Sequence, residues 1–379
     1  MITGLLANIA LQIILTGALV GIAASLLGTF LVLRKNAMLA DAISHSIVFG
    51  IVTVWLLTHV ASGPVQLLGA ALTGVLTVFL TELLASTRRV KDDAAIGLVF
   101  PALFSIGVLL LNIYARDVHV DTHTVLLGEI GFVWLDTMAL AGHEVPVALV
   151  WMSVVTLINA AFVIGFYKEL KLTTFDPMLA SALGFAPGLL FYALLMLTSV
   201  TAVAAFDAVG AVLFIAFVIV PPAAAYLLTD RLAWMLILGM IIAVASSVLG
   251  YVLAVRLDVS IGGMMALMTG VFLAAAFLFG PRYGLVAQAW RRRQEAFANE
   301  IRALVVHLYH HEHSAEQGEE NITAALQRHL AWNNRRAKGV LAHSQHRGLV
   351  LCQGRSLLLT EQGRALARSL IEPWSRERT

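Results

Sequence analysis

Long apolar stretches separated by short polar breaks occupy the first three quarters of the chain. A helix needs about 20 apolar residues to cross a bilayer. Nine stretches have about that length, namely residues 5–33, 38–60, 64–86, 94–112, 146–167, 187–206, 208–228, 232–255 and 261–280. Asp207 separates the sixth from the seventh and is also compatible with a re-entrant segment. The pattern predicts an all-α polytopic membrane bundle of eight to nine transmembrane helices.

Residues 286–379 follow a different pattern, in which short amphipathic segments replace the long apolar ones. We expect helices at residues 300–311, 321–330 (with Asn321 as cap) and 333–346, two short strands around Gly354, and a closing helix at 364–371. This order of helices and hairpin is typical of a winged helix. The sequence therefore predicts a transmembrane domain at residues 1–285 and a small α+β, winged-helix-like domain at residues 286–379.

Composition and charge support this division. Hydrophobic types make up 59% of the 379 residues and charged types only 13%, about half of what a soluble domain carries. Residues 1–290 hold 11 basic and 14 acidic residues, a net charge of −3, whereas residues 291–379 hold 14 and 9, a net charge of +5. Cys352 is the single cysteine, which excludes an intramolecular disulfide and a zinc site made of thiolates.

The basic residues also predict the orientation, because cytoplasmic loops are enriched in Lys and Arg. With the amino terminus outside, only Arg116 and Arg256 of the connecting segments lie outside, and the Arg291–Arg293 run is cytoplasmic. The tail is then cytoplasmic. Residues 5–33 lack a basic leader, so we interpret them as a retained span and not as a signal peptide.

An acidic residue and a histidine lie together in the second predicted span. Asp41 and His45 are four residues apart and share a helix face, with Ser44 near it. Carboxylate and imidazole suit Zn²⁺, Mn²⁺ or Fe²⁺, and a charged group inside a span indicates function. The pair provides two ligands, and a second copy of the chain would provide two more. A purely structural Asp–His pair is the alternative.

Two further groups of residues have the chemistry of metal ligands. His119, Asp121 and His123 alternate in an acidic outer loop, where they either bind metal or form part of a solvated charged loop. In the tail, His307, His310 and His311 have helical spacing and could sense cytoplasmic metal, or form an exposed histidine-rich helix end. No G-x-x-x-x-G-K-[ST] phosphate loop occurs, so we expect no ATPase, and no enzyme, in this chain.

Four segments resemble, in order, the permeases of ATP-binding-cassette (ABC) importers for manganese, zinc and iron. They are FLVLRKNAMLADAISH at 30–45, KDDAAIGLVF at 91–100, FDPMLASALG at 175–184 and AVGAVLFIAFVIVPPA at 208–223. The resemblance implies a fold like that of vitamin B12 and siderophore importer permeases, in a bacterial cytoplasmic (inner) membrane. It also implies metal binding by Asp41 and His45 in the translocation path. No cofactor is expected to stay bound, since Mn²⁺, Zn²⁺ or Fe²⁺ is transported.

The third segment would be the helix that couples the permease to a separate ATPase. Asp176 is a suitable N-cap, Pro177 a suitable first helical residue and Gly184 a suitable stop. The coupling residues would be Phe175, Asp176, Pro177, Leu179, Ala180, Leu183 and Gly184. The expected partners are this ATPase, an extracytoplasmic metal-binding protein and a second permease chain, identical or similar.

The tail has a resemblance of its own. LLLTEQGRALARSL at 357–370 is similar to the end of the DNA-binding domain of diphtheria-toxin-repressor-type metalloregulators. The basic third helix could contact phosphates or face anionic lipid, and we favour a docking or regulatory module over DNA binding.

The alternatives for the whole chain are a membrane-tethered metal-responsive regulator and an ion-coupled secondary metal transporter. The choice among the three metals stays open.

Overall fold

The computed structural model describes residues 8–59, 64–114, 130–140, 143–312, 314 and 317–371. The chain divides into two compact units, Met1–Gly284 and Leu285–Thr379, which we term the membrane unit and the tail unit. Each unit has a hydrophobic core of its own.

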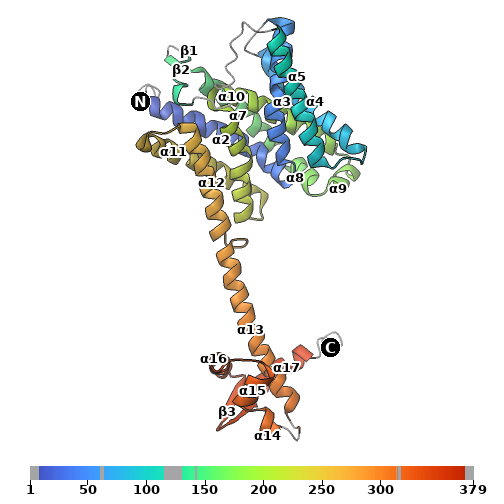
Figure 1. Cartoon of the computed structure of the whole chain (residues 1–379), viewed down its shortest axis with the longest axis vertical. Helices are drawn as coiled ribbons and strands as arrows, with labels where there is room; N and C mark the ends of the chain where they lie inside the picture. Colours follow the sequence, from blue (N-terminus) through green and yellow to red (C-terminus); the bar gives the residue numbers. More distant parts are fainter. Residues whose placement is uncertain are drawn as a thin grey trace. The chain divides into compact units, whose positions relative to one another are not determined.

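Helices form most of the membrane unit (Figure 1). In chain order the elements are α2 (Ile9–Leu33), α3 (Ala37–Thr58), α4 (Pro64–Ser86), α5 (Asp92–Tyr114), the 3-10 turn η1 (Ile130–Phe132), β1 (Thr137–Leu140), β2 (His143–Pro146), α7 (Val147–Gly165), α8 (Tyr167–Phe175), α9 (Pro177–Ala182), α10 (Pro187–Leu228), α11 (Leu232–Leu257) and α12 (Ile261–Phe279). Among the described residues, eight helical segments are long and apolar enough to cross a membrane, and Ala71–Ser86 within α4 is a shorter apolar helix. The predicted bundle of eight to nine spans is confirmed.

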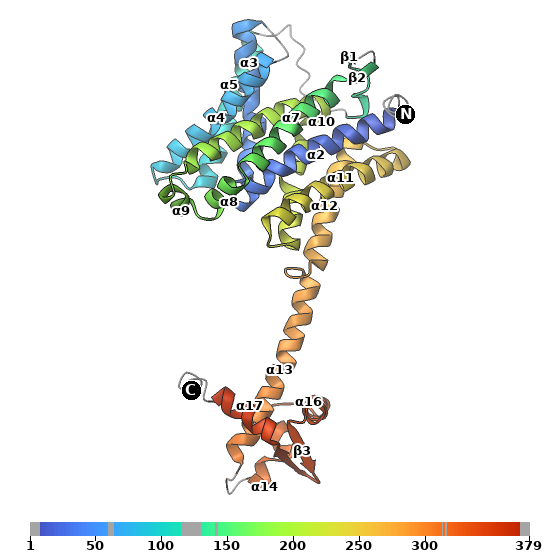
Figure 2. The same ribbon diagram turned by 180° about the vertical axis from the view of Figure 1, so that it is seen from behind.

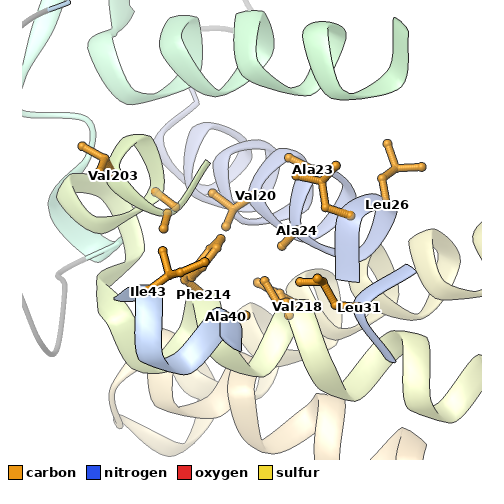
Figure 3. Close-up of a cluster of buried hydrophobic side chains, with 14 of the residues drawn as sticks. Val20, Ala23, Ala24, Leu26, Leu31, Ala40, Ile43, Val203, Phe214 and Val218 are labelled. Carbon is orange, nitrogen blue, oxygen red and sulfur yellow. The ribbon is translucent and has the colours of Figure 1, made fainter. Parts of the chain in front are cut away.

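α2 is the central helix of the membrane unit. It is apolar on all sides, as expected of a helix that other helices surround, and most of its contacts are with α10, α11 and α7. Figure 3 shows Val20 and Ala24 of α2 facing Phe214 and Val218 of α10. A Cβ on Gly28 would lie only 1.9 Å from the backbone oxygen of Val218. The absence of a side chain at residue 28 therefore lets the two backbones meet, as small residues do in membrane helix pairs.

α10 contains a backbone break and includes two candidate spans. Gly210 has φ 76° and ψ 168°, a non-helical conformation close to the start of the second candidate span, Ala208–Leu228, which follows Pro187–Phe206. The rings of Phe206 and Phe214 meet edge to face with centroids 5.9 Å apart. Eight residues of straight helix rise about 12 Å, so this contact fits a bend at Gly210. The side chain of Asp207, beside the break, lies outside the described part of the structure.

Different elements lie at the two ends of the membrane unit. The β1–β2 hairpin lies near the start of α2, whereas α8 and α9 lie at the opposite end of the bundle, near the end of α2 (Figures 1 and 2). β1 and β2 are antiparallel, with Thr137 opposite Pro146. The connection from α2 to α3 therefore lies at the same end as α8 and α9.

The tail unit has helices around a two-stranded hairpin. Its elements are α13 (Leu285–His311), α14 (Gln317–Glu320), α15 (Thr323–His329), α16 (Asn334–His346), β3 (Val350–Gln353), β4 (Ser356–Leu359) and α17 (Glu361–Ile371). Gly354 forms the turn with φ 63°, and β3 and β4 pair antiparallel. The elements follow the predicted order with the short α14 added, and the winged-helix assignment stays a prediction.

Asn321 does not cap the second predicted helix of the tail. α15 starts after Ile322, whose side chain makes no cap hydrogen bond. The buried amide of Asn321 instead donates to the backbone oxygen of Leu308, at 3.3 Å. It therefore fastens the segment between α14 and α15 to the end of α13, because a buried amide needs a partner.

Candidate functional site

Asp41 and His45 lie on a side of α3 that other helices do not cover completely, and we term this side the open stripe of α3. Helical spacing places Met38, Asp41 and His45 on one side of the helix, and none of the three is buried, whereas Ala40, Ala42 and Ile43 are fully buried. The side chains of His45 and Asp41 keep 33% and 32% of their surface exposed. The rest of α3 packs against α2, α4, α5 and α10. An ion or a second chain can reach the pair from this one side.

The distance within the pair fits a shared metal ion. His45 Nε2 and Asp41 Oδ1 are 3.4 Å apart. Two ligands at about 2.0–2.2 Å from one tetrahedral zinc ion are separated by about 3.3–3.6 Å. The pair thus already has the spacing of two ligands on one ion, and two positions would remain for water or for groups from elsewhere.

α5 holds the imidazole of His45 in place. The ring stacks on Phe100, with centroids 5.8 Å apart, and Phe104 meets it edge on at 6.4 Å. Such ring contacts restrict the rotation of the imidazole. These two phenylalanines were not predicted as site residues, although Phe100 closes the KDDAAIGLVF segment.

Ser44 differs from the pair in its burial. Its side chain is buried, and its hydroxyl donates to the backbone oxygen of Ala40 at 2.7 Å. The hydroxyl therefore has its hydrogen-bond partner within its own helix. The three predicted loop ligands, His119, Asp121 and His123, lie outside the described residues.

The predicted coupling segment forms a short capped helix with an apolar exposed face. Leu179 N donates to Asp176 Oδ1 at 2.9 Å, Pro177 opens α9, and Gly184 follows with φ 87°. Ala180 is fully buried. The exposed apolar side chains of this segment are Phe175, Met178, Leu179 and Leu183. An exposed apolar patch of this kind indicates a surface for another protein.

Arg34, at the end of α2, contacts both α8 and α10. Its guanidinium donates to Thr173 Oγ1 at 2.9 Å and to Thr174 Oγ1 at 3.3 Å, both in α8. It also lies 5.0 Å from the ring centroid of Phe191 in α10. Arg34 is the C-cap of α2, seven residues before Asp41. No spacing in the sequence links residue 34 to residue 173, so these contacts could not be predicted.

The tail histidines lie partly together. Among the described residues, one group of three possible ligands has all its ligand atoms within 4.8 Å, namely His307, His311 and Glu320. His310 is exposed and is not in this group. Burial lowers the pKa of His307, because an apolar environment disfavours the charged imidazolium.

The comparisons with known proteins agree with one another. The model described as the ABC 3 transport family matches residues 7–280. The zinc transport system membrane protein TroD of Treponema pallidum is 43% identical over 362 residues, 96% of this chain and 99% of that protein. The manganese transport system membrane protein MntD of Bacillus subtilis is 50% identical over 280 residues, 74% of this chain and 95% of that protein.

A solved structure has a similar fold. A chain of PsaBC from Streptococcus pneumoniae, in complex with Fab, matches with a TM-score of 0.62 and 26% identity, covering 74% of this chain and 96% of that chain. The match with TroD takes in 96% of this chain and so includes much of the tail unit. The family model ends at residue 280, before the tail unit begins.

Proposed function

The chain belongs to the ABC 3 transport family, and we propose that it is the membrane-spanning permease of an ATP-driven importer of divalent transition-metal ions. The relatives named as zinc and manganese transport proteins support this class of substrate. The observation that carries the proposal is the Asp41–His45 pair, whose atoms are 3.4 Å apart on the open stripe of α3.

The pair would act as a transient ligand set in the translocation path. A divalent ion entering the membrane has to exchange water for protein ligands, because an unpaired charge in hydrocarbon is strongly unfavourable. Carboxylate and imidazole bind Mn²⁺, Fe²⁺ and Zn²⁺. Two ligands from one chain hold an ion weakly enough to release it. A second permease chain with the same open stripe would complete four-fold coordination.

The α8–α9 end would contact the ATPase. α9 offers exposed apolar side chains on a capped helix, and Arg34 joins α8 to the end of α2, next to α3. A displacement of α9 would thus reach α3 through packed helices and charged hydrogen bonds. The energy would come from the partner, with ATP hydrolysis outside this chain.

The proposed orientation follows from the basic residues. Lys168 and Lys171 in α8 belong to the α8–α9 end, and basic connections are cytoplasmic. This end would face the cytoplasm, where the ATPase is, and the β1–β2 end would face the extracytoplasmic metal-binding protein. The carboxyl-terminal tail would be cytoplasmic, and the protein would lie in the bacterial cytoplasmic membrane.

Uptake by single-residue variants tests the proposal. Asp41→Ala and His45→Ala are expressed with the ATPase and binding protein at matched membrane levels, and uptake of Mn²⁺, Zn²⁺ and Fe²⁺ is measured separately. We expect one metal to accumulate with the unchanged chain and neither variant to support its uptake. His59→Asn is the matched control, because His59 ends the same helix with φ 55°, a conformation that Asn tolerates, away from the pair.

Two results would contradict the proposal. Full uptake by both Asp41→Ala and His45→Ala would make the pair structural. Uptake by the unchanged chain in cells that lack the ATPase would instead indicate an ion-coupled secondary transporter.

A further inference from the structure

Three segments of the tail unit converge on one cluster of ligand-type side chains. His307 and His311 are one turn apart near the end of α13, and their ring centroids are 4.9 Å apart. Glu320 ends α14 and His329 ends α15. The ring of His329 lies 5.9 Å from that of His307, and its Nε2 is 3.2 Å from Glu320 Oε2. Residues up to 22 positions apart in the sequence thus lie close together in the tail unit.

The spacing of the cluster is close to that of a metal site. The ligand atoms of His307, His311 and Glu320 lie within 4.8 Å of one another. Around a tetrahedral Zn²⁺, with ligands at about 2.0–2.2 Å, they would be separated by about 3.3–3.6 Å. Side-chain rotations of about 1 Å at the ligand atoms would close this difference.

The carboxylate of Glu320 is a second observation in favour of a ligand. The side chain keeps only 19% of its surface exposed. Its Oε2 atom is buried and receives no hydrogen bond from the described residues, and its one ion-pair partner among them is His329, whose Nε2 is 3.2 Å away and carries charge only when the ring is protonated. A buried carboxylate oxygen is unfavourable unless a cation or donors compensate it. A divalent cation between Glu320 and the imidazoles would supply that compensation.

The backbone around the cluster is held in place. The amide of Asn321, next to Glu320, donates to the oxygen of Leu308 in α13, and Asn321 O accepts from Leu357 N at 2.8 Å. Glu320 is therefore fastened to the same turn of α13 that carries His307. These hydrogen bonds hold ligands from separate segments at fixed positions relative to one another.

We propose that His307, His311 and Glu320, with His329 as the fourth ligand, form a binding site for one divalent transition-metal ion such as Zn²⁺ in the tail unit. Three imidazoles and one carboxylate match the nitrogen and oxygen ligands that zinc takes in proteins. The site lies outside residues 7–280, which the family model matches, and does not involve Asp41 or His45. It gives the chain a metal site separate from the transport path.

Binding of Co²⁺ to the full-length chain in detergent micelles tests the proposal. Co²⁺ is a useful probe because its visible absorption is strong in four-coordinate sites and weak in six-coordinate ones. Asp41→Ala and His45→Ala are introduced first, so that the membrane pair does not contribute ions. We expect this parent to bind one Co²⁺ with four-coordinate absorption, and one equivalent of Zn²⁺ to displace it.

His307→Ala should abolish this absorption and remove one ion per chain. His310→Ala is the matched control, because His310 is the same residue type on the same helix but outside the group of three. It should leave the spectrum unchanged. Glu320→Gln keeps the shape of the side chain and should weaken binding at least about tenfold. This second variant tests the site even if His307→Ala loses the metal because it misfolds.

Two results would overturn the proposal. One is equal binding of Co²⁺ by the parent, His307→Ala and Glu320→Gln. The other is an equal loss with His310→Ala, which would indicate a histidine-rich surface without a defined site. Because the parent lacks Asp41 and His45, the outcome is independent of whether the chain transports metal.

Discussion

Replacing Gly28 by alanine should separate the two most closely packed helices of the membrane unit. The added Cβ would lie 1.9 Å from the backbone oxygen of Val218 and 2.8 Å from its carbonyl carbon. Carbon and oxygen atoms ordinarily approach no closer than about 3.3 Å, so about 1.4 Å of separation is missing. The atom in the way belongs to a backbone, which cannot rotate aside as a side chain can.

The expected destabilisation follows from this distance. Overpacking a tight interface costs about 1–3 kcal/mol, and a backbone clash on α2, the central helix, belongs at the upper end. Alanine regains up to about 1 kcal/mol because it favours the helix more than glycine does. We therefore expect Gly28→Ala to lower the free energy of unfolding by about 2 kcal/mol.

Gly270→Ala is the matched control. Gly270 lies in α12, and no atom of the described residues is within 4 Å of the position that its Cβ would take. The same substitution there should keep only the gain in helix propensity and stabilise the protein by up to about 1 kcal/mol. The two variants therefore differ in the sign of their effect.

Unfolding in mixed micelles, titrated with dodecyl sulfate and followed by circular dichroism, measures the difference. A change of about 2 kcal/mol alters the ratio of folded to unfolded protein about 30-fold, which shifts the midpoint clearly. Equal midpoints for Gly28→Ala and Gly270→Ala would refute the close approach of α2 and α10.

Two further predictions concern the α8–α9 end. Asp176→Ala removes the acceptor for Leu179 N and should destabilise the six-residue α9 by about 0.5–2 kcal/mol; we expect weaker binding of the ATPase in a pull-down from membranes, whereas Asp176→Asn, which can still cap, should bind as before. Arg34→Ala removes a charged hydrogen bond to Thr173 and the contact with Phe191, together about 2–4 kcal/mol. In proteoliposomes it should lower the number of metal ions transported per ATP hydrolysed, and an unchanged ratio would contradict the proposed connection.

Much of the fold could be predicted because a bilayer imposes simple rules. A span has to be apolar over about 20 residues, and its backbone hydrogen bonds have to be made internally, which favours a helix. Hydropathy therefore located the long helices of the membrane unit. Local chemistry also predicted α9, because Asp176 and Pro177 favour a helix start and Gly184 favours its end. The prediction of Asn321 as a cap was wrong, because a tertiary hydrogen bond to Leu308 took precedence over the local preference.

In the candidate sites, too, some features follow from the local sequence and others from tertiary packing. Asp41 and His45 are four residues apart on one helix, so the sequence alone determined that their side chains lie together. The phenylalanines around His45 and the threonines that bind Arg34 come from other helices, and only packing decides which residues these are. Glu320 likewise joins His307 and His311 across a bend of the chain, whereas His310, their neighbour in sequence, stays outside the group.

The sequence by itself thus determined the membrane spans, the division into two parts and the pairing of Asp41 with His45, since each depends on the periodicity of a single helix or on the length of one apolar run. The tertiary structure decided the approach of Gly28 to Val218, the connection through Arg34 and the meeting of Glu320 with the tail histidines. These depend on contacts between segments distant in sequence, which form only when whole helices pack together.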